Sequence, residues 1–353
     1  MQTLHIITPS SYTTSAACIR LMQMTMKHLG GSHQVLVIGD EMDATEIRSR
    51  DMNVLGSIDG PVNASGTLDR RVRNLVDSIS TRIQPLRIFA WGWHGATVAS
   101  GLGGDYNPVA IVDDIDRSCS MSTGTMTIIP TSQAGSKILR SLGVPIESIA
   151  EPNVGVVPTS VLVDRSTVRD LLHIQDSEIV VALVGKRLSW QEVIRMAARF
   201  RSASQHVDLV IPAGYLDHAQ LVDVARKQGL SDMLHDSPSQ LRHIDIVHGV
   251  DAVWAPLVAQ YDESCEVLDV IETAMSGVPL VVSESHHVAS VPDMGSLIAT
   301  SKSQIDICGW IISLQEDTTE KLEIAEALKA HITPLASPSI FIEGLQLRMP
   351  STF

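Results

Sequence analysis

Residues 264–283, SCEVLDVIETAMSGVPLVVS, combine a helical pattern, a glycine break and an apolar run in direct succession. Apolar residues recur at helical spacing from Leu268 onward, Gly277 is suited to a helix C-terminus, and Pro279 cannot continue a helix. The run LVV that follows is therefore predicted to begin a strand. This stretch predicts a helix that feeds a buried strand of an α/β domain, with one carboxylate, Glu272, inside the helix.

Short β-branched runs alternate with helical or loop segments along the whole chain. The first half contains LHIITP, QVLVIG, NVLG, LRIFAWG, VAIVDD and TIIPT, and the second contains IVVALVG, VDLVIPAG, IDIVHG, AVWAP, PLVVS and SLIAT. Apolar runs of this length, each followed by a polar or glycine-containing turn, are typical of strands buried on both faces of a parallel sheet. The sequence therefore predicts an α/β protein with two doubly wound parallel sheets.

The length of the chain, 353 residues, exceeds what one hydrophobic core usually serves, which predicts two domains. Residues 152–164 carry two prolines and a glycine without a helical period, as expected of a linker. We therefore predict domains at 1–155 and 156–337. The run EKLEIAEALKAHI predicts a late helix that HITPLASPS interrupts, and 338–353 contain one more short helix.

Composition narrows the classes of partner. Hydrophobic residues make up 44% and charged residues 19%, as in a soluble globular protein. The net charge of -14 disfavours a broad electrostatic grip on nucleic acid or on an anionic membrane. The four cysteines show no disulfide or zinc spacing, and no leader or bilayer-spanning run is present, so we expect a cytoplasmic protein.

The run ETAMSGVPLVV resembles the EAMAxGxPVV signature of GT-B glycosyltransferases, the glycogen-synthase-like retaining group (glycosyl transferase group 1 type). GKRL at 185–188, WGWHG at 91–95 and the pair LGVP and PNVGV at 142–156 resemble further motifs of that group, in the same order. The resemblance implies two Rossmann-like domains facing a cleft, with 338–353 packed back on the first. It also implies retaining, metal-independent transfer of a sugar from a nucleotide diphosphate, without a cofactor.

The resemblance assigns donor-binding roles to the second half of the chain. Glu272 is expected to hold the ribose, Lys186 and Arg187 the diphosphate, and Glu263 the sugar hydroxyls, with Ser264 at the position that matches the family's glutamate. The residues themselves leave alternatives open. A basic pair is often only a solvated surface feature, and acids before a helix also favour its dipole.

In the first half, His94 and Asp114 are the candidate catalytic residues on the acceptor side. His94 follows a predicted strand, where a packed structural histidine is an equally good explanation. Asp114 is one of three acids in DDID directly after another buried strand, where it could bind or deprotonate an acceptor hydroxyl, or simply lie in a solvated turn.

Two polar pairs are further candidates for a cleft. Ser10 and Ser11 lie in the turn after the first strand, where hydroxyls also cap helices; this turn has no GxGxxG, which argues against a dinucleotide-dependent dehydrogenase. His286 and His287 stand where relatives carry a glycine pair, and such a pair is often only a polar loop.

Departures from the family pattern keep other functions open. The lysine usual after the arginine is absent, and Cys265 and Glu266 replace glycines before Glu272. A non-catalytic GT-B protein acting as a binding or scaffold subunit is the first alternative, and a nucleotide-sugar epimerase or hydrolase is the second. The expected partners are a nucleotide sugar and an unidentified glycan, lipid or small-molecule acceptor, without nucleic acid; peripheral membrane contact stays open.

Overall fold

The computed structural model describes most of the chain and divides it into two compact units. The described residues are 2–7, 16–39, 41–58, 70–85, 87–102, 106–113, 115, 125–185, 189–203, 205–212, 215, 217–238, 240–256, 267–283, 299–301, 304–313 and 318–348. The first unit contains Met1–Val157, Glu263–Leu268 and Ala336–Phe353, and the second contains Pro158–Asp262 and Asp269–Leu335.

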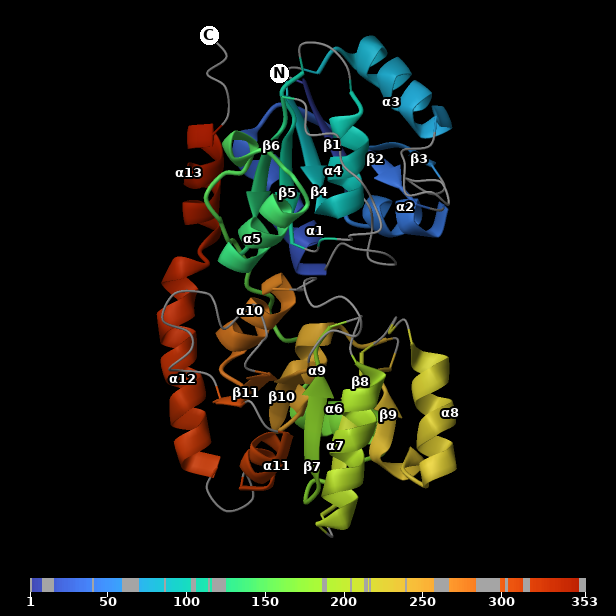
Figure 1. Cartoon of the computed structure of the whole chain (residues 1–353), viewed down its shortest axis with the longest axis vertical. Coiled ribbons are helices and arrows are strands. Elements are labelled where there is room, and N and C mark those ends of the chain that lie inside the picture. Colours follow the sequence, from blue (N-terminus) through green and yellow to red (C-terminus); the bar gives the residue numbers. More distant parts are fainter. Residues whose placement is uncertain are drawn as a thin grey trace. The chain divides into compact units, whose positions relative to one another are not determined.

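The first unit is built on a parallel sheet in the order β3-β2-β1-β4-β5-β6 (Figure 1). Its strands are β1 (Gln2–Ile7), β2 (Ser32–Ile38), β3 (Val54–Ile58), β4 (Arg87–Trp91), β5 (Val109–Val112) and β6 (Thr127–Pro130). Its helices are α1 (Ala16–Leu29), α2 (Glu41–Arg48), α3 (Arg70–Ile83), α4 (Gly92–Ser100), α5 (Gln133–Ser141) and α13 (Pro338–Arg348), with a 3-10 turn at Ile146–Ser148.

The second unit repeats this plan, with the sheet order β12-β11-β10-β7-β8-β9 and parallel pairing throughout. Its strands are β7 (Ile179–Leu183), β8 (Val207–Ile211), β9 (Leu234–Asp236), β10 (Ala252–Ala255), β11 (Leu280–Ser283) and β12 (Ala299–Ser301). Its helices are α6 (Arg165–Leu172), α7 (Trp190–Ser202), α8 (His218–Gln228), α9 (His243–Gly249), α11 (Gln304–Ile312) and α12 (Thr318–Leu335), with a 3-10 turn at Ser231–Met233. The division between units passes through α10 (Val267–Ser276), after Leu268.

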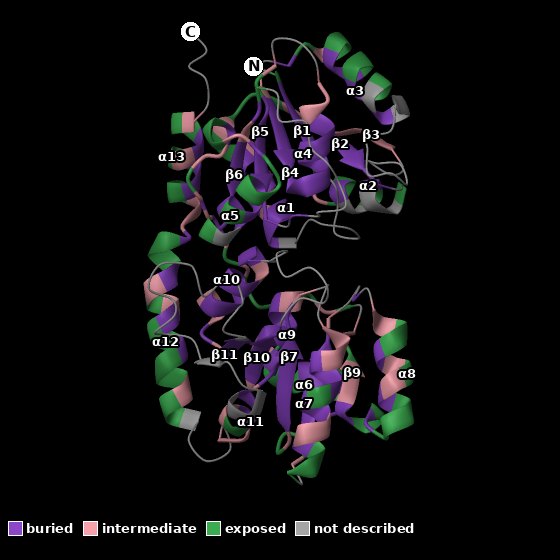
Figure 2. Cartoon of the chain, in the orientation of Figure 1, coloured by how far each residue is buried: buried purple, intermediate pink, exposed green. Residues whose placement is uncertain are grey.

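The predicted fold class, two doubly wound parallel sheets, is confirmed. Both sheets are buried along their central strands, while the outer helices keep an exposed face (Figure 2). All of β5 and β7 is buried, as expected when helices cover both faces of a parallel sheet. In each sheet the chain adds strands on one side of its first strand and then crosses to the other side. That crossing places a topological switch point between β1 and β4 and another between β7 and β10.

Two local predictions were wrong. The run IDIVHG, predicted as a strand, forms helix α9, whose Gly249 lies so close to Val168 of α6 that a Cβ would overlap it. Six residues are too few for apolar periodicity to distinguish a buried helix from a buried strand. Helix α12 also continues through HITPL to Leu335, with Pro334 as its penultimate residue, although a proline cannot donate a backbone hydrogen bond there.

The last helix, α13, packs within the first unit. The Asn153 side-chain amide donates to the backbone oxygen of Phe341 at 2.9 Å, and the backbone N–H of Val156 donates to Ala336 at 2.9 Å. Gly155 lies against Phe341 with no room for a Cβ. These contacts anchor the C-terminal helix to the segment 153–156. Among the helices that the structure describes, none has the length and apolar character that a bilayer crossing needs.

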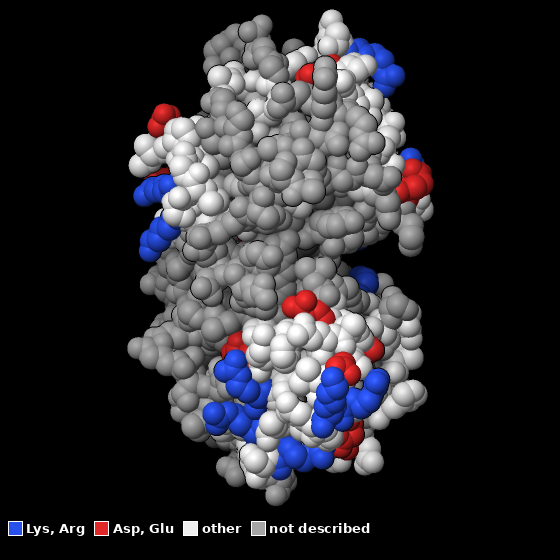
Figure 3. Space-filling view, turned by 45° about the vertical axis from the view of Figure 1, so that its right-hand side comes forward, with Lys and Arg blue, Asp and Glu red and all other residues white. Residues whose placement is uncertain are grey.

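Surface charge in the second unit consists of interspersed basic and acidic side chains (Figure 3). Several of them are paired at exposed positions, including Arg201 with Asp232 at 2.5 Å and Lys227 with Asp223 at 2.6 Å. Exposed pairs of this kind contribute little stability.

Candidate functional site

In the second unit, the turn after β7 lies at the switch point between β7 and β10. Parallel α/β sheets bind ligands at the carboxyl ends of the strands beside such a point. Gly185 ends the described part of this turn with φ +112°, a conformation that side-chain-bearing residues rarely adopt. The Ser189 hydroxyl then caps α7 by accepting the N–H of Glu192 at 3.3 Å. Helix α7 is thus the helix that follows β7 at this switch point, and its N-terminus is capped by Ser189.

Helix α10 follows β10 and presents Glu272 as a buried carboxylate. The Glu272 side chain is 3% exposed, and its Oε1 accepts a hydrogen bond from the Thr159 hydroxyl at 2.8 Å. On the same helix, the Thr273 hydroxyl lies 3.3 Å from Nε2 of His243, the first residue of α9. Glu272 thus lies where α10, the start of α9 and the segment after Pro158 come together within the second unit.

An arginine clamp holds that segment in place. Arg242 contacts Asp245 with two 2.7 Å bonds and donates to the backbone oxygen of Ser160 at 2.8 Å. Asp245, whose side chain is almost fully buried, also accepts the N–H of Leu162 at 2.8 Å. The pKa of Asp245 is lowered to about 2, mainly by the hydrogen bonds from the Arg242 side chain. The pKa of Arg242 is raised chiefly by Asp245, and the charge of Glu272 contributes to this rise.

In the first unit, the corresponding switch point lies between β1 and β4. Gly92 has φ +77° and makes an abrupt turn from β4 into α4, so that His94 falls in the first turn of the helix. A Cβ on Gly95 would lie 3.0 Å from the backbone oxygen of Ile6, which shows how closely α4 approaches β1. His94 is buried, with 7% of its surface exposed. The WGWHG motif is thus a glycine-dependent packing unit that also places a histidine at the carboxyl edge of the sheet.

A second buried carboxylate lies at the end of β5. Asp113 Oδ1 accepts the Thr131 hydroxyl at 2.8 Å and the N–H of Leu268, in the first turn of α10, at 3.3 Å. A carboxylate in this position satisfies one of the backbone N–H groups that a helix N-terminus leaves unpaired. Next along the chain, the Ser132 hydroxyl caps α5 through the N–H of Gly135. Asp113 therefore has a structural role, which is to hold Thr131 and the first turn of α10.

Of the residues singled out from the sequence, His94 and Glu272 lie in the described part of the chain, in separate units. The others lie outside the described residues: Ser10, Ser11, Asp114, Lys186, Arg187, Glu263, Ser264, His286 and His287. Sequence reasoning missed Thr159, Arg242 and Asp245 as neighbours of Glu272. No local signal points to them, because Thr159 and Glu272 are 113 positions apart.

Solved structures share this architecture over nearly the whole chain. Anabaena Alr3699/HepE, in complex with UDP and glucose, superposes with a TM-score of 0.75 at 16% identity and covers 100% of both chains. The chain has the GT-B fold. Sucrose-phosphate synthase from Thermosynechococcus elongatus gives a TM-score of 0.72 at 12% identity over 98% of each chain. A Listeria monocytogenes protein assigned as UDP-N-acetylglucosamine 2-epimerase gives 0.62 at 10% identity over 97% of this chain and 94% of its own.

The likeness is structural rather than one of sequence. No protein-family model matches the chain, and no curated protein matches it significantly in sequence. The solved structures similar to this chain at this level of identity include both a synthase and a protein assigned as an epimerase. A shared fold does not by itself assign a ligand or an activity, which have to be argued from the residues.

Proposed function

We propose that the protein is a glycosyltransferase that moves a sugar from a nucleotide diphosphate to an acceptor, with retention and without a metal ion. The observation that carries the proposal is Glu272, a buried carboxylate on the helix after β10, beside the switch point of a GT-B second unit. Carboxylates are suitable acceptors for the two hydroxyls of a ribose. The Alr3699/HepE structures with UDP and with UDP-glucose support a nucleotide sugar as donor.

The contact with Thr159 helps to orient the Glu272 carboxylate. The Thr159 hydroxyl donates to Oε1 of Glu272 at 2.8 Å. The clamp of Arg242 and Asp245 fixes the backbone on the C-terminal side of Thr159, which in turn orients the carboxylate. Pre-oriented groups of this kind bind a substrate with less loss of side-chain freedom. We assign the ribose to Glu272 on this basis.

The remaining roles follow the family resemblance. Lys186 and Arg187, which follow Gly185 in the sequence, bind the diphosphate, and Glu263 and Ser264 bind the sugar. In the first unit, His94 and Asp114 bind the acceptor and assist loss of its hydroxyl proton. The two polar pairs, Ser10 with Ser11 and His286 with His287, complete the contacts around the substrates.

Transfer breaks the bond between the sugar's anomeric carbon and the diphosphate oxygen and forms one to the acceptor oxygen. The acceptor proton leaves to a base, and negative charge builds up on the diphosphate. A lysine and an arginine that shortly precede α7 in the sequence suit that charge, because a helix N-terminus and nearby cations both stabilise an anion. The protein's main contribution is then to position both substrates and to stabilise the leaving group.

A thermal-shift panel with UDP, GDP, ADP and their sugar conjugates tests the donor site. One nucleotide series should raise the melting temperature, since a ligand at a hundred times its Kd stabilises by about 2.7 kcal/mol. In Glu272→Gln the affinity should fall roughly 10- to 100-fold, as expected when a charged hydrogen-bond acceptor is lost. Glu323→Gln, at an exposed glutamate of α12, is the matched control and should leave affinity unchanged.

Thr159→Val separates a ligand role of Glu272 from a structural one. This variant removes the hydroxyl bond but keeps the carboxylate, so the protein should lose stability while nucleotide affinity stays within a few-fold of wild type. If Glu272 only anchors Thr159, both variants will lose stability and neither will change nucleotide affinity. Unchanged affinity in Glu272→Gln would remove the central residue of the proposal.

Product analysis separates transfer from the alternatives. The likeness to the Listeria protein makes an epimerase the second candidate. The nucleotide sugar found by thermal shift is incubated with and without acceptor candidates and followed by NMR. Acceptor-dependent release of nucleoside diphosphate supports the transferase. Formation of an epimer without acceptor supports the epimerase, and binding without turnover across acceptor classes supports a binding subunit.

A further inference from the structure

A polar cluster lies at the amino ends of strands β7 and β8 in the second sheet, away from the proposed donor site. Glu178 immediately precedes β7, His206 immediately precedes β8, and Asp208 is the second residue of β8. These positions lie at the amino ends of the strands, whereas the switch-point site lies at the carboxyl ends. The cluster therefore needs an explanation of its own.

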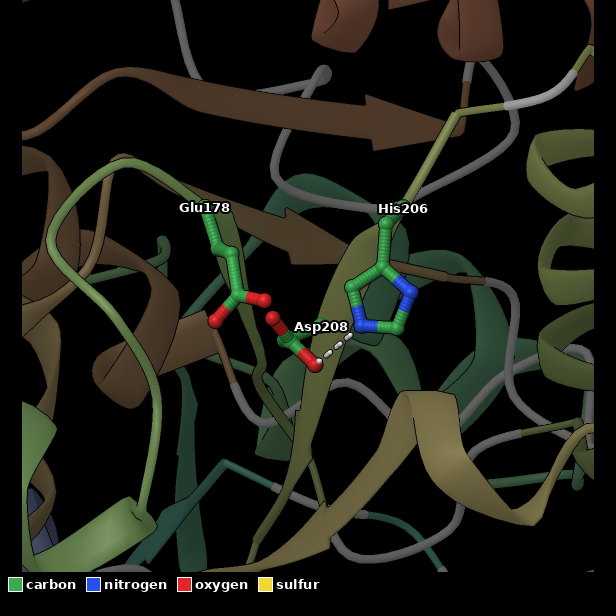
Figure 4. Close-up of side chains that lie close together, drawn as sticks. All are labelled: Glu178, His206 and Asp208. Atoms are coloured by element: carbon green, nitrogen blue, oxygen red, sulfur yellow. Dashed lines mark hydrogen bonds and ion pairs between the residues drawn. The ribbon is translucent and has the colours of Figure 1, made fainter.

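Strand register brings these side chains onto one face of the sheet. Val180 pairs with Asp208, and Val210 pairs with His235 of β9. Because side chains alternate between faces along a strand, Glu178, His206, Asp208 and His235 all project from the same side. Figure 4 shows Glu178 and His206 on either side of Asp208, which points between them.

Asp208 is the centre of the cluster and is 2% exposed. Its Oδ1 lies 2.7 Å from Nε2 of His235 and 3.2 Å from Nε2 of His206. Its Oδ2 is buried and has no hydrogen-bond partner among the described residues. In Figure 4 this oxygen faces the carboxylate of Glu178. A buried carboxylate oxygen directed at a second carboxylate is unfavourable unless a cation or a proton lies between them.

We propose that Glu178, His206 and Asp208 bind a divalent transition-metal ion of the Zn²⁺ type. One potential ligand atom from each residue lies within 4.8 Å of the others. Ligands of a tetrahedral zinc ion lie about 3.4 Å apart, given metal–ligand distances of about 2.0–2.2 Å, so small side-chain rotations close the site. A mixed imidazole and carboxylate set suits zinc better than Mg²⁺ or Ca²⁺, which prefer oxygen ligands alone.

The surroundings of the cluster fit a metal site. His235 acts as an outer partner that holds Asp208 in place, a role that commonly orients metal ligands. His206 is 45% exposed, which leaves an entry path from solvent. The nearby Arg169 contacts only the backbone oxygen of Glu178 within this cluster and pairs its charge with Asp251. The ion would join the starts of β7 and β8 and therefore stabilise the second unit.

Metal content of the purified chain tests the site directly. The protein is stripped with EDTA, loaded with excess ZnCl₂ or MgCl₂, passed over a desalting column and analysed by mass spectrometry. We expect one zinc ion per chain and no retained magnesium. Loss of an outer partner of a metal ligand typically weakens metal binding 10- to 100-fold. His206→Ala and Asp208→Asn each remove a ligand itself and should weaken zinc binding by at least that much. His218→Ala is the matched control and should retain the ion, because His218 also pairs with an aspartate, Asp236, but outside the cluster.

The melting temperature provides an independent test, because the effect of Asp208→Asn on stability should depend on whether zinc is present. Without metal, Asp208→Asn should melt at the same temperature as wild type or higher, because it removes the contact between two carboxylates. With zinc, wild type should gain stability and Asp208→Asn should not. If wild type retains no zinc after desalting, or if both cluster variants retain as much as wild type, the site is refuted. His206→Ala decides the matter if Asp208→Asn fails to fold, since His206 is largely on the surface.

Discussion

Removing the carboxylate charge of Asp245 should weaken the second unit by an amount that depends on pH. The pKa of Asp245 is lowered from 3.8 to about 2, mainly by hydrogen bonds from Arg242 and also by the N–H of Leu162. This pKa difference corresponds to roughly 2.4 kcal/mol, at 1.36 kcal/mol for each pKa unit. The Arg242 side chain is 41% exposed, so solvent screening reduces the expected effect of Asp245→Asn to about 1–2 kcal/mol.

The sign of the pH dependence follows from the lowered pKa. A carboxylate with a depressed folded-state pKa stabilises fully above its unfolded pKa, near 3.8, and this contribution is lost as the pH falls toward about 2. Urea unfolding of wild type and Asp245→Asn at pH 7, 4 and 3 should therefore show a gap that is largest at pH 7 and smaller at pH 3. If the two units unfold separately, the gap should appear in one transition only.

The control is an exposed pair of the same chemistry. Asp232, 59% exposed, contacts Arg201 on the surface of the second unit, and Asp232→Asn should cost less than about 1 kcal/mol at every pH. A gap for Asp245→Asn that is equally large at pH 7 and pH 3 would show that side-chain packing, not charge, is responsible. A gap no larger than that of Asp232→Asn would refute the clamp.

Two further substitutions test the packing around the sites. The Arg169 side chain is 1% exposed and donates hydrogen bonds to three backbone carbonyls and one carboxylate, so Arg169→Met should lower the free energy of unfolding by about 3–5 kcal/mol. The control, Arg165→Met, changes a side chain that is 44% exposed and should cost under about 1 kcal/mol. Equal losses of the two variants in urea unfolding would contradict this reasoning. Gly95→Ala should cost about 1–3 kcal/mol by thermal unfolding, because the new Cβ would press on the Ile6 backbone, while Gly56→Ala, with open space around it, should be nearly neutral; a neutral Gly95→Ala would show that α4 can shift freely.

The fold class was predictable because the chain carries its strands as continuous apolar runs. IVVAL and VAIV were recognised as buried strands from composition and from the turns after them, and the structure buries every residue of both. The run IDIVHG was misread because six apolar-rich residues fit a buried helix equally well. The signal is reliable where a run is bounded by turns and weak where tertiary packing selects between helix and strand.

In the candidate sites, single residues were predictable from the sequence, but their spatial neighbours were not. Glu272 was predicted from a local motif as a ribose ligand; the structure places it in helix α10, and its ligand role stays a prediction. Its partners Thr159 and Arg242 could not be predicted, since neither lies near it in sequence. The metal cluster was missed as well, although Glu178 and His206 each directly precede a predicted strand.

The sequence alone thus determined what a short segment can decide: which runs are apolar enough to be buried, where glycine and proline end a helix, and which motif carries a carboxylate. These properties depend on interactions within a few residues of the chain. Which strands become neighbours, and hence that Glu178, His206 and Asp208 share a face of one sheet, was decided only in the tertiary structure. The physical reason is that strand order and register arise from the packing of whole helices and sheets, which no local pattern encodes.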